Sequence, residues 1–191
     1  CKVLHEALAT CSELNKKINN QIINSLSPDQ ILHLTTQKSI TNELNLTNLV
    51  TAFYRMAKKM QNRNKMSLNQ FVQDRRFVKL INLIPILLAN NNGDNNDVAD
   101  QIGISSLSVI QEEAIKHPNG ILSNLLWSLA KLKFAPKTEN DFEIIHRMCK
   151  SAKNDIDHME PQELSSCMWA LSVILNVDRR PLSSSDVDLF V

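Results

Sequence analysis

The chain has 191 residues and a formal charge of +1, with 21 Lys and Arg against 20 Asp and Glu, which excludes a highly charged tail that binds a polyanion by bulk charge. Hydrophobic residues make up 43% and charged residues 21%, so the composition is globular, and only 3 Gly and 6 Pro leave few turns for an all-β fold. No apolar run approaches the roughly 18–20 residues of a membrane-spanning helix. We therefore expect a soluble all-α protein.

The predicted elements begin with a long helix over residues 1–26. Its apolar residues recur at helical spacing, as Leu4, Leu8, Cys11, Ile18 and Ile22. Ser27, Pro28 and Asp29 then form a typical helix start, because Ser caps exposed N–H groups and Pro fits the first turn.

Three later segments share one apolar pattern, with residues at offsets 0, 3, 4, 7 and 10 from a Leu. The copies are Leu46, Leu49, Val50, Phe53 and Met56; Leu122, Leu125, Leu126, Leu129 and Leu132; and Leu164, Cys167, Met168, Leu171 and Ile174. Copies that start at 46, 122 and 164 lie 76 and 42 residues apart, and 76 is twice 38. This spacing indicates a repeat of about 38 to 42 residues.

A second amphipathic stretch precedes the later two copies, so each repeat is predicted to be a helix A followed by a helix B. These stretches are Leu107, Ile110, Ala114 and Ile115, and Phe142, Ile145, Met148, Cys149 and Ala152. Between the first two copies, residues 77–88 are predicted to supply another unit around a kinking Pro85, followed by a disordered Asn-rich loop at 90–97. The predicted fold is a right-handed α-solenoid of about four helix pairs.

The predicted domain organisation has three parts. Residues 1–26 form an N-terminal helix, residues 27–180 form the helical-repeat array, and residues 181–191 start a further repeat. The capping pattern at 183–186 suggests that the chain is a fragment of a longer array.

A basic stretch is the clearest charge feature, with Asp74 the one acid within it. It contains Arg55, Lys58, Lys59, Arg63, Lys65, Arg75, Arg76 and Lys79, and a smaller cluster follows at Lys131, Lys133 and Lys137. Such density suits phosphate neutralisation, so Lys131 and Lys133 join the first eight as candidate RNA-binding residues. The alternatives are a solvated helix face and, for the second cluster, cations that stabilise a helix C-terminus.

Trp127 and Trp169 occupy one repeat position, where the first copy has Thr51. Aromatic side chains stack on bases in single-strand binders, but a Trp repeated beside an apolar stripe favours packing. We interpret both as core residues that cover the seam between repeats.

Catalytic, metal and cofactor sites are not expected. The chain has no Gly-rich phosphate loop, no GxSxG and no HExxH, and its 4 cysteines form no CxxC pair. His146, Cys149, His158 and Cys167 lack the tight ligand pairs of a zinc site. We predict no enzyme, no cofactor and no small-molecule substrate, and a reducing compartment.

The segments 121–132, 161–172, 48–58 and 74–77 together resemble the helices of octotricopeptide repeat and RAP-domain proteins. The similarity rests on the Leu-Leu-Trp-Ser-Leu-Ala-Lys-Leu run at 125–132, on the helix from Asn48 to Lys58, and on Asp74-Arg75-Arg76-Phe77. It covers roughly residues 27–180, and the repeats lack the proline-rich signature of the most regular members. A C-terminal RAP segment is absent from the 191 residues, so no nuclease-like activity is carried over.

The resemblance implies an α-solenoid that binds organellar RNA, in mitochondria or alternatively in plastids. We expect a mitochondrial protein that binds rRNA or mRNA through its basic face, with a mitochondrial ribosome component as one such role and neighbouring ribonucleoprotein subunits as partners. The rival is a protein-binding scaffold of the armadillo or HEAT type, which overall neutrality favours.

Overall fold

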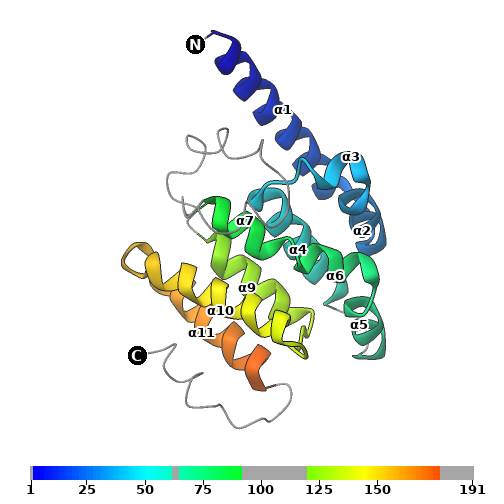
Figure 1. Cartoon of the computed structure of the whole chain (residues 1–191). Coiled ribbons are helices and arrows are strands. Elements are labelled where there is room, and N and C mark those ends of the chain that lie inside the picture. The colour runs from blue at the N-terminus through cyan, green and yellow to red at the C-terminus, as the bar shows by residue number, and fades with distance from the viewer. Residues whose placement is uncertain (1, 62–64, 92–119, 177–191) are drawn as a thin grey trace.

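The computed structural model describes residues 2–61, 65–91 and 120–176, and every regular element in them is helical (Figure 1). The helices are α1 Lys2–Asn24, α2 Pro28–Thr36, α3 Lys38–Thr41, α4 Leu46–Met60, α5 Lys65–Val72, α6 Arg75–Ile81, α7 Ile84–Asn91, α9 Ile121–Lys131, α10 Glu139–Asn154, the 3₁₀ turn η1 Ile156–His158, and α11 Pro161–Asn176. The all-α prediction is confirmed for these residues, among which no helix is long and apolar enough to span a bilayer.

Side-chain caps fix the starts of several helices. Ser27 accepts a hydrogen bond from the backbone N–H of Gln30, and the Gln30 side chain accepts one from the Ser27 N–H, which completes a capping box at α2. The pairs Asn45 with Asn48 and Thr138 with Asp141 do the same at α4 and α10. The predicted start at residue 27 is therefore correct, and Pro161 opens α11 as its first residue.

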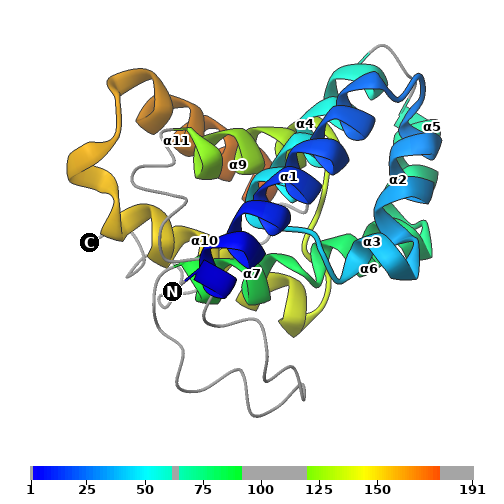
Figure 2. The same ribbon diagram turned by 90° about the horizontal axis from the view of Figure 1, so that it is seen from above.

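The helices form two layers. In one, α1, α4, α9 and α11 lie side by side, each packed against the next. In the other, α2 packs against α6, and α7 against α10. Figure 2 shows the first row along one side of the molecule, with α10, α7 and α6 along the other. The three apolar copies of the repeat thus lie on three consecutive helices of one row, α4, α9 and α11.

The core lies between these layers and contains the stripes that define the repeat. All five stripe residues of α4 and all five of the second copy are buried, and Phe53 of α4 meets Phe77 of α6 edge to face at 5.5 Å between ring centroids. In α11 the stripe splits. Cys167, Leu171 and Ile174 are buried, whereas Leu164 and Met168 are exposed.

The segment between the first two copies differs from the prediction. We expected a further unit there, but α4 and α9 pack directly against each other. Residues 77–88 belong to two helices, α6 and α7, and Pro85 is the second residue of α7, where its missing N–H costs nothing. Proline starts this helix instead of kinking it.

Several predicted segments lie outside the described residues. They are the helix A over 107–115, the start of a further repeat at 181–191, and residues 92–97 of the predicted loop. Helix α7 ends at Asn91, two residues into the Asn-rich run.

Candidate nucleic-acid interface

Two cations of the basic stretch bind backbone carbonyls at and just beyond the end of α1. The Arg55 guanidinium donates to the Ile23 carbonyl oxygen at 2.7 Å, and the Lys59 ammonium to the Leu26 carbonyl oxygen at 3.3 Å. Ile23 is in the last turn of α1, where carbonyls lack intrahelical partners and lie at the negative end of the helix dipole, whereas Leu26 is in the connection to α2. Arg55 and Lys59 are four residues apart, so one side of α4 presents both to α1.

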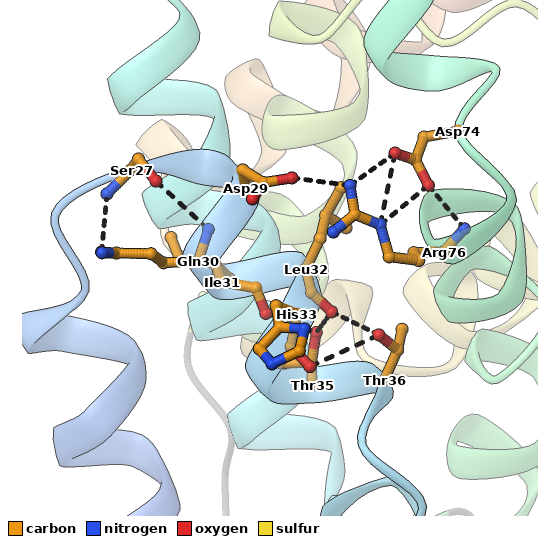
Figure 3. A network of polar contacts seen from close by, with 10 residues as sticks. All are labelled: Ser27, Asp29, Gln30, Ile31, Leu32, His33, Thr35, Thr36, Asp74 and Arg76. Atoms are coloured by element: carbon orange, nitrogen blue, oxygen red, sulfur yellow. Dashed lines mark hydrogen bonds and ion pairs between the residues drawn. The ribbon is translucent and has the colours of Figure 1, made fainter.

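Arg76 forms an ion-pair network with two aspartates (Figure 3). Its Nη2 atom lies 2.6 Å from Asp29 Oδ1 and 2.7 Å from Asp74 Oδ2. Asp74 also caps α6 by accepting from the Arg76 N–H at 2.8 Å. Hydrogen bonding to the Arg76 side chain outweighs the opposing effect of burial and lowers the pKa of Asp74 below its ordinary value. This cation ties α6 to α2.

Other predicted cations remain directed at solvent. Lys58, Arg75 and Lys79 are exposed, and Arg75 and Lys79 make no hydrogen bond or ion pair with another described residue. Arg63 lies outside the described residues. Lys65 is the first residue of α5, and its side chain is not among those that the structure describes. The basic stretch therefore divides into internally bound and exposed cations.

A row of alternating aromatic rings and lysines crosses α4, α9 and α11. Lys58 Nζ lies 5.6 Å from the ring centroid of Tyr54 and 5.3 Å from that of Trp127. Lys131 Nζ lies 5.6 Å from the Trp127 centroid and 4.7 Å from that of Trp169. The rings of Tyr54 and Trp127 have centroids 5.5 Å apart and are tilted by 38°. We call these five residues the aromatic–lysine row.

Helical geometry explains why these side chains meet. Tyr54 and Lys58 are four residues apart on α4, as are Trp127 and Lys131 on α9, so each pair shares one helix side. Because α9 lies between α4 and α11, its pair can contact both neighbours. Each ammonium lies within the roughly 6 Å at which a cation is attracted to a ring face.

The interpretation of the tryptophans as core residues is wrong for Trp169 and is borne out in part for Trp127. Trp169 is 41% exposed, and Trp127 is only partly buried against the core. At about 100° per residue, the Trp position five residues after the first Leu lies roughly 140° round the helix, nearly opposite the centre of the buried stripe. This calculation uses the sequence alone, so the exposure of this Trp position could have been predicted without the structure.

Lys131 and Lys133 lie at the end of α9. Lys131 belongs to the aromatic–lysine row, while Lys133 is exposed and has a φ of 56°, which L-residues rarely adopt. The Phe134 N–H donates to the Leu129 carbonyl and the Lys133 N–H to the Ala130 carbonyl, which is the Schellman arrangement that usually has Gly in place of Lys133. Lys137 is exposed just before α10.

Cys149 of α10 and Cys167 of α11 are buried neighbours with free thiols. Burial, with a smaller effect of the Cys167 charge, raises the pKa of Cys149 to about 11. Burial and the nearby Glu163 raise the pKa of Cys167 to about 11. Both thiols are protonated near neutral pH, and no three His, Cys, Asp or Glu side chains of the described part of the chain are grouped to hold a metal ion.

Comparisons of the chain with protein-family models, with curated proteins and with solved structures gave no match.

Proposed function

We propose that this chain is an organellar RNA-binding helical-repeat protein, and that a mitochondrial ribosome, in which it would bind rRNA, is one setting for it. The aromatic–lysine row carries the proposal. Cations that neutralise phosphates and rings on which bases stack are the two components of a surface that binds single-stranded nucleic acid. Here both occur together on one side of three neighbouring helices.

Exposed cations on α6 form a second candidate patch, in the other helix layer from the aromatic–lysine row. Arg75 and Lys79 are four residues apart, so they share one side of the helix, and both are exposed. Arg55, Lys59 and Arg76 contribute differently, because their hydrogen bonds hold α1, α2, α4 and α6 in place. In this proposal they position the RNA-binding surface without contacting RNA.

The solenoid is part of the same proposal. The row α1, α4, α9 and α11 supports a stack of repeated helices, because each helix packs against the next. A row built in this way places equivalent helix faces side by side, so a residue type that recurs in the repeat forms a line on the surface.

Crosslinking and sequencing of RNA bound to the protein in mitochondrial extracts, combined with sedimentation, tests this function. Organellar rRNA that co-sediments with a ribosomal particle would support a ribosomal role. Messenger RNA in lighter fractions would instead support a transcript factor. RNA recovery at the level of a Lys58→Gln, Lys131→Gln control would contradict RNA binding through this surface.

A protein-binding scaffold remains the second candidate, and one observation favours it. Met168 of α11 is 54% exposed, whereas the equivalent Val50 and Leu126 are 7% and 0% exposed. A neighbour covers this position in the two earlier copies, so α11 presents an uncovered apolar face of the kind that contacts proteins. Loss of a co-purified protein partner in a Met168→Glu variant, with RNA binding unchanged, would support the scaffold.

A further inference from the structure

We propose that the aromatic–lysine row is a stacking site for the unpaired bases of single-stranded RNA, and that one base stacks on the exposed ring of Trp169. This inference rests on the proposed RNA-binding function and names the form of RNA that the surface takes. The rings of Trp127 and Trp169 come from adjacent helices, α9 and α11, and Lys131 Nζ lies over both.

Distances within the row show which rings already contact each other. Tyr54 and Trp127 have centroids 5.5 Å apart, so their rings already touch and no base fits between them. Trp169 is 41% exposed, and its contact within the row is with Lys131 Nζ, 4.7 Å from the ring centroid. Its ring can therefore take a stacked base once that lysine moves aside.

Lys131 is the side chain that a base would displace. An exposed cation–π contact contributes about 2- to 5-fold to an equilibrium constant, whereas a stacked base contributes about 5- to 150-fold. The displaced ammonium would remain next to the RNA backbone, where it neutralises a phosphate. When a base displaces the Lys131 side chain, both the stronger stacking contact and the neutralised phosphate therefore favour RNA binding.

Base pairing would prevent this mode of binding. In a duplex the base faces are stacked on each other and the rings of a protein cannot reach them, so stacking recognition selects unpaired nucleotides. The exposed ring of Trp169 and the exposed ammonium of Lys58 lie at opposite parts of the row, so a single strand can contact both kinds of group along its length.

Intrinsic fluorescence gives a direct test, because Trp127 and Trp169 are the 2 tryptophans of the chain. The full chain is titrated with fluorescein-labelled single-stranded oligo(U) or oligo(A) of about 12 nucleotides, within the site sizes of single-strand binders, and with an RNA duplex of equal length. Anisotropy measures binding and tryptophan emission reports stacking. We expect saturable quenching by both single strands and none by the duplex.

Trp169→Ala should weaken single-strand binding about 5- to 150-fold, the effect of one lost stacked base. Phe142→Ala is the matched control, because Phe142 is also an exposed ring, on α10 outside the row. Trp127→Phe keeps a ring in a partly buried position and should retain most of the affinity.

The possible results separate the two proposals. RNA binding with unchanged tryptophan emission, or with equal affinities for the wild type and Trp169→Ala, would overturn the stacking site and leave the RNA-binding function in place. Equal quenching by the duplex would overturn selectivity for single strands. Absence of any anisotropy change for the wild type with all three probes would contradict the RNA-binding function itself.

Discussion

The two sides of helix α4 use the same kind of residue in different ways. On the side that faces α1, Arg55 and Lys59 donate to the carbonyls of Ile23 and Leu26. On the side that faces α9, Lys58 lies over the rings of Tyr54 and Trp127 and remains exposed. Cations that satisfy backbone carbonyls stabilise the fold, whereas an exposed cation beside aromatic rings is available to a ligand. Charge density along a sequence does not distinguish the two.

Among the substitutions that distinguish the two sides of α4, Arg55→Ala is expected to have the largest effect. Loss of a charged hydrogen bond to a helix-terminal carbonyl should lower the free energy of unfolding by about 2 kcal/mol. RNA affinity of the folded variant should change little. Urea denaturation measures the first quantity and anisotropy the second. For Lys58→Ala we expect the reverse pattern, with stability within about 1 kcal/mol of the wild type, and a similar loss of stability in both variants would contradict the division.

Asp74→Ala tests a second structural use of a cation. The change removes the cap of α6 and a partner of Arg76, so we expect a loss of about 1–2 kcal/mol at neutral pH. Because the folded pKa of Asp74 lies below its ordinary 3.8, its stabilisation is complete above that value and disappears as the pH falls through the folded pKa.

The stability difference between wild type and Asp74→Ala, measured by urea denaturation at several pH values, should therefore shrink only in acid. Asp157→Ala, an exposed aspartate in the η1 turn, serves as the control. A difference that stays constant below pH 3.8 would show that the carboxylate charge contributes nothing.

Lys133→Gly should separate stability from binding at the end of α9. Glycine adopts the φ of 56° without strain, so the variant should be about 0.5–1 kcal/mol more stable. Removal of an exposed charge should also reduce the salt dependence of RNA binding slightly, by about 0.7 in slope if Lys133 contacts a phosphate. Lys137→Gly removes the same charge at a position without positive φ and should bring no gain in thermal stability.

A separate prediction, independent of the RNA-binding surface, concerns the thiols of Cys149 and Cys167. With a pKa of about 11 against an ordinary 9.0, each has about a hundredfold lower thiolate fraction near pH 8 than an exposed thiol. In a Cys1→Ser, Cys11→Ser background, alkylation should be slow until the protein unfolds. Stability should fall as the pH rises above 9.0, because the unfolded thiols ionise first. Fast alkylation of the native protein would contradict their burial.

Local features of this fold follow from sequence, while helix neighbours do not. The buried stripes of α4 and α9, part of the stripe of α11 and the cap at Ser27 were predictable because they depend on spacing and short-range hydrogen bonds. A stripe indicates which face is buried but not which helix buries it, so the direct packing of α4 on α9 was missed.

The candidate site shows the same limit. Arg55 and Arg76 bind acceptors within the protein because of where α1 and α2 lie in the fold. No local sequence pattern predicts those positions. The position of Trp127 and Trp169 opposite the buried stripe, by contrast, follows from helical geometry alone. The contact of Tyr54 with Trp127, and those of Lys131 with both tryptophans, could be expected only once α4, α9 and α11 were known to be neighbours.

The most direct test compares two double variants that remove the same charge from one protein. Salt dependence of single-stranded RNA affinity is measured for Lys58→Gln with Lys131→Gln and for Arg55→Gln with Lys59→Gln. For single strands, each phosphate contact contributes about 0.7 to the slope of log affinity against log salt. We predict that the first pair lowers the slope by about 1.4 and that the second leaves it unchanged in the folded protein. Equal decreases for both pairs, or a decrease for the second alone, would contradict the assignment of RNA binding to the aromatic–lysine row.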